Sequence, residues 1–177
     1  MLLRLFCIIC VLAAASLGVL SQEVPKAEVF GGYSWTGPSL QGVDASITGN
    51  VNHWFGVTAD YSGHFGSEQV SGIRLHKTAH TVQFGPRFSK RGKRLTPFAH
   101  ALFGATRFKQ FATIDDTYIY ETATGFTSTV GGGLDVRVTK RVAIRAFQID
   151  YFRPNFFGIS DNRLRASFGV VFRIGKR

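Results

Sequence analysis

The sequence predicts an all-β fold: an eight-stranded antiparallel up-and-down transmembrane β-barrel that follows an N-terminal signal peptide. Three observations predict it. Apolar and polar residues alternate with a period of two from residue 27 onward, which indicates strands with two different faces. The polar faces carry charged and small residues, while Tyr and Trp lie near the ends of the apolar faces, the inverted arrangement of a membrane barrel. Short and longer connections also alternate along the chain.

The first 21 residues are expected to form a signal peptide that is removed during export. A short basic start is followed by sixteen uncharged, mostly apolar residues, and cleavage is expected after Ser21. An N-terminal membrane anchor is the alternative, but a spanning helix needs about 20 apolar residues. We therefore expect a signal peptide at residues 1–21 and one barrel domain at residues 22–177.

Both cysteines of the chain, Cys7 and Cys10, lie within this apolar segment. After cleavage the chain therefore has no thiol, no disulfide and no cysteine ligand for a metal. An exported protein without disulfides needs another source of stability, and a closed barrel in which every strand is paired supplies one.

The chain carries 21 Lys and Arg against 11 Asp and Glu, which gives a formal net charge of +10. So basic a chain would ordinarily favour a nucleic-acid partner. Export argues against nucleic acid, and the basic residues occupy turns and polar strand faces instead of one patch. One turn holds Lys90, Arg91, Lys93 and Arg94, so an anionic membrane surface is the better partner.

Eight segments carry the strand pattern, and no helical period persists after the signal peptide. They are Ala27–Trp35, Leu40–Asn50, Phe55–Gly63, His80–Phe88, Thr96–Phe108, Phe126–Val138, Val142–Phe152 and a last strand that ends at Ile174. Their lengths approach the roughly 9–11 residues that a tilted strand needs to cross a bilayer. Longer links at His64–Ala79, Lys109–Gly125 and Arg153–Arg163 alternate with short turns. Short periplasmic turns and longer external loops are typical of outer-membrane barrels.

Two positions disturb the alternation. Pro86 lies inside a predicted strand and lacks the N–H that a ladder needs, so we expect a bulge or an irregular register there. In the segment Val142–Phe152 the outward apolar residues stand at even positions up to Ala146 and at odd positions from Ile149 onward. One extra residue near Phe147, a bulge, would restore a continuous apolar face.

Aromatic residues gather near strand ends, as expected for girdles at two membrane interfaces. One rim would hold Trp54, Phe55, Phe88, Phe98 and Phe172, and the other Tyr33, Trp35, Tyr61, Phe126, Tyr151 and Phe152. The apolar strand faces between the rims, which include Val57, Val136 and Phe168, are expected to contact lipid.

Several segments resemble the strands of small outer-membrane β-barrel proteins. They are AEVFGGYSW at 27–35, FGPRF at 84–88, TPF at 96–98, VGGGLD at 130–135, IRAFQIDY at 144–151 and FGVVF at 168–172. Over nearly the whole mature chain, the sequence is similar to the eight-stranded barrel domain of the outer-membrane protein A type, within the broad porin-like family. The resemblance implies a Gram-negative outer membrane and insertion by the barrel-assembly machinery. The chain ends Gly-Lys-Arg instead of on an aromatic residue, so Phe172 or Ile174 would serve as the terminal recognition position.

Residues that could support catalysis or bind a metal form weak patterns. His64 and Ser67 could act as base and nucleophile of a lipid-modifying enzyme, but their spacing matches no such motif. His64, His76 and His80 would have to converge in a loop to bind a metal. The acidic residues of the 109–125 link could attract a hard cation, although a solvated loop is the simpler reading. We therefore predict no catalytic, cofactor or metal site.

The polar strand faces give the stronger signal. Assigned to the lumen by alternation, they place carboxylates opposite guanidiniums in an interior just wide enough for side chains. The candidate lumen salt-bridge residues are Glu28, Asp44, Asp60, Arg87, Asp135, Arg137, Arg145, Asp150, Arg165 and Arg173. Arg–carboxylate pairing would satisfy these groups and plug the lumen.

We therefore predict a non-enzymatic integral protein of the bacterial outer membrane, with a structural, envelope or surface-interaction role and a largely plugged lumen. Its expected partners are outer-membrane lipid and, during biogenesis, the barrel-assembly machinery. We expect a monomer with no cofactor and no nucleic-acid partner. The alternatives are an outer-membrane lipid-modifying enzyme, a small passive pore, or a soluble exported binding barrel that resembles a lipocalin.

Overall fold

The structure is a computed structural model that describes residues 24–37, 40–70, 73–114, 117–156, 159–160 and 162–175. Its strands are β1 (Ala27–Thr36), β2 (Leu40–Asn50), β3 (Phe55–Val70), β4 (Ile73–Ser89), β5 (Leu95–Ile114), β6 (Thr117–Arg137), β7 (Val142–Phe156), β8 (Ile159–Ser160) and β9 (Arg163–Ile174). The predicted signal peptide lies outside the described residues. Within them, no helix is long and apolar enough to span a membrane.

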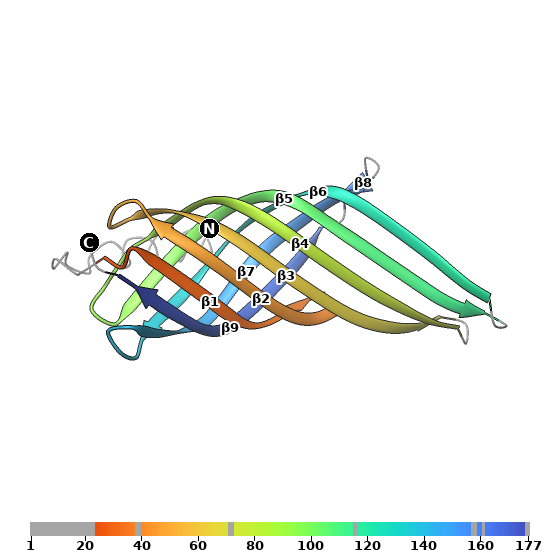
Figure 1. Cartoon of the computed structure of the whole chain (residues 1–177), viewed down its shortest axis with the longest axis horizontal. Coiled ribbons are helices and arrows are strands. Elements are labelled where there is room, and N and C mark those ends of the chain that lie inside the picture. Colours follow the sequence, from red (N-terminus) through yellow and green to blue (C-terminus); the bar gives the residue numbers. More distant parts are fainter. Residues whose placement is uncertain are drawn as a thin grey trace, which may run out of the picture.

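The strands close into one antiparallel barrel (Figure 1). From β1 to β7 each strand pairs with the next one in sequence, and β9 joins β7 to β1. Ala27 opposes Ile174, so the first strand begins where the last one ends. The two-residue β8 pairs with the end of β7, outside the eight-stranded ring. The predicted fold class, a closed eight-stranded antiparallel barrel, is confirmed.

Five neighbouring strands, β3 to β7, are longer than the sequence predicted, and β7 takes in the first four residues of the predicted link Arg153–Arg163. β3 and β4 have 16 and 17 residues, and β5 and β6 have 20 and 21. Most of His64–Ala79 and Lys109–Gly125 therefore continues the strands, so the prediction of loops there was wrong. Beyond the lipid both faces of a strand meet water, and the period of two that reveals a strand is lost. Figure 1 shows the two long hairpins, β3–β4 and β5–β6, reaching past the other strands at the end opposite the start of β1.

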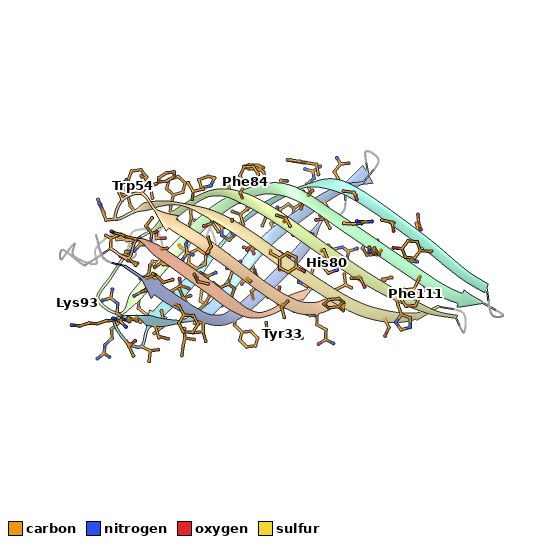
Figure 2. All side chains as sticks on the ribbon, viewed as in Figure 1. Tyr33, Trp54, His80, Phe84, Lys93 and Phe111 are labelled. Carbon is orange, nitrogen blue, oxygen red and sulfur yellow. The ribbon has the colours of Figure 1, made fainter. Side chains whose placement is uncertain are left out.

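The outer face of the barrel is apolar and ends in aromatic side chains. Tyr33, Trp35, Tyr61, Phe126 and Tyr151 are exposed near one rim, and Trp54, Phe88 and Phe172 near the other. Trp54 stacks on Phe88 with ring centroids 5.8 Å apart. Figure 2 shows the side chains of Tyr33, Trp54 and Phe84 pointing away from the ribbon. These residues follow the predicted girdles.

Two aromatic residues predicted for the girdles lie elsewhere. Phe98 is only 6% exposed and Phe152 only 7%, and both face the lumen. Both share the inward parity of their strands, with neighbours His100 on β5 and Asp150 on β7. The rim assignment was wrong because it considered how far along the strand each residue lies but not which face of the strand it occupies.

The predicted bulge near Phe147 is confirmed, whereas the irregularity at Pro86 is not. β7 shifts its register between Arg145 and Gln148 against β9, which places both of these side chains in the lumen. The pairing of β4 with β5 skips Gly85 and Pro86 and resumes in the same register, with Arg87 opposite His100. The ladder therefore tolerates the missing N–H of the proline without an inserted residue.

Candidate functional site

The candidate site is the lumen, into which the polar strand faces project. Five acidic side chains are at most 4% exposed there: Glu28, Asp44, Asp60, Asp135 and Asp150. Alternation explains their position, because each stands on the face of its strand opposite the apolar residues. Buried carboxylates require charged or hydrogen-bonding partners, and the structure supplies both.

Asp135 on β6 lies between two guanidiniums. Arg145 Nε donates to Asp135 Oδ1 over 2.8 Å, and Arg145 Nη2 contacts Oδ2 at 3.4 Å. Arg87 Nη2 on β4 donates to the same Oδ2 over 2.8 Å. Asp135 is fully buried, and both arginines are 2% exposed. The triad therefore joins three strands across the lumen.

Two phenylalanines complete the surroundings of this triad. The guanidinium carbon of Arg87 lies 3.9 Å from the ring centroid of Phe98. That of Arg145 lies 4.0 Å from Phe30 and 4.5 Å from Phe98. Guanidiniums stack favourably on aromatic faces when water is excluded. Sequence reasoning missed both rings, although their inward parity was a signal that could have found them.

A second cluster surrounds Arg165 on β9. Its Nε and Nη2 atoms donate to Asp150 Oδ2 at 3.0 and 2.8 Å, and Nη1 donates to Asp60 Oδ1 at 3.1 Å. His100 Nε2 is hydrogen-bonded to Asp150 Oδ1 over 2.8 Å. Gln148 links the two clusters, because it accepts from Arg145 Nη1 (2.6 Å) and donates to Asp150 Oδ2 (2.7 Å).

A residue from a turn fills the end of the lumen near the chain termini. Arg91, in the β4–β5 turn, donates through Nη2 to Glu28 Oε2 (3.2 Å) and through Nη1 to the carbonyl of His53 (3.0 Å). Arg173 Nε lies 3.5 Å from the other Glu28 oxygen. Burial lowers the pKa of the Arg91 guanidinium, and the Glu28 carboxylate opposes that shift. Sequence reasoning had placed Arg91 at the membrane surface.

The ten predicted lumen residues are not all joined in the same way. Asp44 accepts from Ser167 Oγ at 2.8 Å, and Arg173 also contacts Thr96. Arg137 is the last residue of β6 and lies half-buried, with its backbone N–H donating to the carbonyl of Arg94. The other members form the contacts around Asp135, Arg165 and Glu28 described above.

Hydroxyl and amide side chains fill the space beside the charged groups. Thr81, Thr106 and Thr127 form a chain of hydrogen bonds at 2.9 and 2.7 Å. Thr129 donates to Gln83 Oε1 at 2.9 Å. All of them except Thr106, whose strand had an ambiguous phase, were expected to face inward, but the alternation alone did not show that they pair across strands.

A cavity opens at the lumen mouth on the side of the long hairpins, with an empty volume of about 380 Å³ including open solvent. His64 lines it, and its Nε2 lies 3.0 Å from both Ser34 Oγ and Thr36 Oγ1. The hydroxyl suggested as a nucleophile belongs to Ser67, which shares the outward parity of Phe65. The two residues therefore face opposite sides of β3.

The histidines suggested as metal ligands also separate. His64 faces the lumen, whereas His80 and His76 pair opposite Gly63 and Ser67 on the outer face. His80 Nδ1 lies 2.9 Å from the hydroxyl of Tyr61, and His76 stacks on Phe111. Across the described part of the chain, no group of three His, Cys, Asp or Glu side chains is arranged to hold a metal. Asp115 and Asp116 lie outside the described residues.

Solved structures of similar fold are small outer-membrane barrels. Ail, the attachment invasion locus protein of Yersinia pestis, matches with a TM-score of 0.66 at 15% identity, covering 85% of this chain and 99% of Ail. Neisserial surface protein A matches with a TM-score of 0.56 at 12% identity, covering 87% of this chain and 100% of that one. The N-terminal barrel domain of Pseudomonas aeruginosa OprF matches with a TM-score of 0.53 at 16% identity, covering 85% and 98%.

A comparison with curated protein sequences gives no match. The family model described as "outer membrane protein beta-barrel domain" matches residues 7–172, which is nearly the whole chain. That match agrees with the closed barrel, its apolar exterior and its aromatic rims. The chain therefore belongs to the outer membrane protein beta-barrel domain family and is a protein of the bacterial outer membrane.

Proposed function

We propose that this outer-membrane barrel is a non-enzymatic structural component of the envelope, and that its lumen is plugged. The observation that supports the plug is the ionic network of the lumen, which comprises Arg91–Glu28 at one end and the linked clusters around Asp135 and Arg165. An eight-stranded barrel has an interior just wide enough for side chains to fill. Water and solutes therefore have little free path through the lumen.

The network would also stabilise the barrel and resist rearrangement. Each arginine is held by partners on other strands, as Arg165 is by Asp60 and Asp150. Removing one partner of a buried pair leaves an uncompensated charge in a medium of low polarity. Transient breakage is therefore costly, and this supports a closed lumen over a small passive pore.

A surface-contact role is a second candidate, supported by the long hairpins. β3 to β6 extend beyond the remaining strands and expose Phe111 and Tyr120. Exposed aromatic side chains outside the lipid are available to another molecule. The similar fold of Ail, whose name describes attachment and invasion, is compatible with this role.

A flux assay tests the structural proposal. The purified chain is reconstituted into phospholipid vesicles, and the swelling rate in isotonic arabinose is compared with that of vesicles holding a general porin. We expect swelling no faster than in vesicles without protein. Swelling at a rate approaching that of the porin would contradict the plug.

The enzymatic alternative needs its own test. The same vesicles are prepared with lipid A, and the lipid is analysed by mass spectrometry after prolonged incubation. We expect every acyl chain to remain in place, because His64 and Ser67 face opposite sides of β3. Time-dependent loss or gain of an acyl chain would assign the protein to the lipid-modifying enzymes.

A further inference from the structure

The described acidic residues all stand on the inward face of the barrel strands, whereas basic residues stand on both faces. Of the acidic residues whose side chains are described, five are buried in the lumen, and Glu121 stands on the same face of β6 as the lumen residues Thr127 and Thr129. The outward face toward the long hairpins instead carries Arg107 and Lys109. In the described part of that face no carboxylate neutralises these cations, so its potential is positive.

The strand register places both cations on β5, between polar residues of β4 and β6. Arg107 stands between His80 on β4 and Thr124 on β6. Lys109 follows two residues later on the same face, about 7 Å along the strand. Its neighbours are Thr78 and Thr122. We call His80, Arg107 and Lys109 the outer basic patch.

The outer basic patch begins where the apolar band ends. Two residues before Arg107 stands Ala105, whose neighbours Val82 and Phe126 are both 60% exposed on the outer face. The next pair toward the chain termini is Phe84 with Phe103, both also exposed. The charged groups therefore lie at the height where acyl chains meet their headgroups.

Two tyrosines, Tyr61 and Tyr120, lie beside the outer basic patch and interact with its residues. The Tyr61 hydroxyl lies 2.9 Å from His80 Nδ1, and the two rings stack with centroids 6.2 Å apart (Figure 2 labels His80). Farther out, the pKa of the Tyr120 phenol is lowered, mainly by a hydrogen bond with Thr122. The positive charges of Lys109 and Arg107 act in the same direction.

We propose that the outer basic patch binds the phosphate of an anionic lipid of the outer leaflet, whose acyl chains lie against Val82, Phe84 and Phe126. The Arg107 guanidinium matches the geometry of phosphate oxygens, and the Lys109 ammonium adds a second positive charge. Thr122 and Thr124 offer hydroxyl donors beside them. This inference rests on the outer-membrane location and goes beyond the proposed structural role.

The location of the outer basic patch beside exposed apolar side chains favours a lipid over a soluble anion. A phosphate attached to acyl chains combines the charge of the patch with the exposed apolar side chains directly beneath it. A soluble phosphate or a sulfated polysaccharide would use only the charged groups. The test therefore separates the lipid from its headgroup.

The full chain is reconstituted into phosphatidylcholine nanodiscs that contain a small fraction of fluorescent lipid A, and energy transfer from the tryptophans measures binding. The R107Q/K109Q variant should bind this lipid roughly 30-fold more weakly, because two basic residues at the membrane surface are removed. The K140Q/R141Q variant loses the same charge at an exposed turn at the opposite end and should bind within about 2-fold of wild type. R107K keeps the positive charge but loses the forked donors of the guanidinium, so its binding should lie between that of wild type and that of R107Q/K109Q.

Three further probes decide between occupants. Lipid A from which the phosphates have been removed should bind the wild type as weakly as lipid A binds R107Q/K109Q. Inorganic pyrophosphate and heparin should not displace lipid A at concentrations that leave ionic strength unchanged. Equal losses in R107Q/K109Q and K140Q/R141Q would overturn the proposal, as would tight heparin binding that depends on Arg107 and Lys109. Heat-modified gel mobility establishes that each variant is folded.

Discussion

Replacing Asp135 with alanine should destabilise the barrel by about 3–5 kcal/mol. The carboxylate is fully buried and accepts hydrogen bonds from Arg87 and Arg145, both at 2.8 Å. Without it, two guanidiniums stay in the lumen with no carboxylate between them. Removing one partner of a buried ion pair typically costs about 3–5 kcal/mol, because the remaining charge is uncompensated. The Phe98 and Phe30 rings offset only part of this loss.

The free energy of unfolding can be measured by urea titration of the protein in phospholipid vesicles. The chain has two tryptophans, Trp35 and Trp54, and both are exposed on the outer face, so their fluorescence reports loss of contact with lipid. Glu121→Ala is the matched control, since it removes an exposed acidic side chain and should change stability by less than about 0.5 kcal/mol.

Asp135→Asn separates charge from shape. The amide keeps the volume but carries no charge, so most of the loss should remain. A loss below about 1 kcal/mol for both substitutions would refute the reasoning, because it would mean that the arginines do not depend on Asp135.

Three other substitutions test separate parts of the structure. Val130→Arg should destabilise by about 2–4 kcal/mol in the same titration, since Val130 is 60% exposed on the lipid-facing side of β6; a cost near zero would place it outside the lipid. Arg91→Ala removes the turn residue that fills one end of the lumen, so small channel events should become more frequent in planar bilayers than in wild type, and unchanged recordings would show that Arg91 does not close that end. Gly133→Val should lower stability by roughly 1–3 kcal/mol, because a Cβ at Gly133 would overlap the Phe147 carbonyl oxygen and lie 2.9 Å from the Phe98 ring. Full stability would show that β6 and β7 can separate there.

The alternation of residues predicted most of the barrel. Within the lipid the two faces of a strand meet opposite environments, so the phase of a strand such as β9 identifies its inward residues. The same phase predicted the bulge near Phe147, because lipid contact requires a continuous apolar face. Outside the lipid that requirement ends, which is why the extensions of β3 to β6 were predicted as loops.

The lumen partners were less predictable than the lumen residues. The alternation assigns both Asp135 and Arg145 to the lumen. Which guanidinium pairs with which carboxylate depends on the stagger between the strands and on side-chain length. Arg91 shows this limit: it lies in a turn, where the alternation of a strand gives no information about side-chain direction, yet its side chain reaches Glu28. Phe98 shows another, since the two guanidiniums that stack on its ring come from other strands and are not indicated by the pattern of its own strand.

The most direct test of the closed, lipid-embedded barrel compares two adjacent positions on β6. Thr129 is fully buried in the lumen, and Val130 is exposed on the outer face. Single cysteines at these positions, in a background with Cys7 and Cys10 replaced by serine, are treated in vesicles with a membrane-impermeant maleimide and with a lipid-soluble one. We predict that the cysteine at 130 reacts only with the lipid-soluble reagent and the cysteine at 129 with neither. Rapid reaction of the cysteine at 129 with the impermeant reagent would reveal a water-filled lumen, and equal labelling of both positions would contradict the alternation on which the barrel is built.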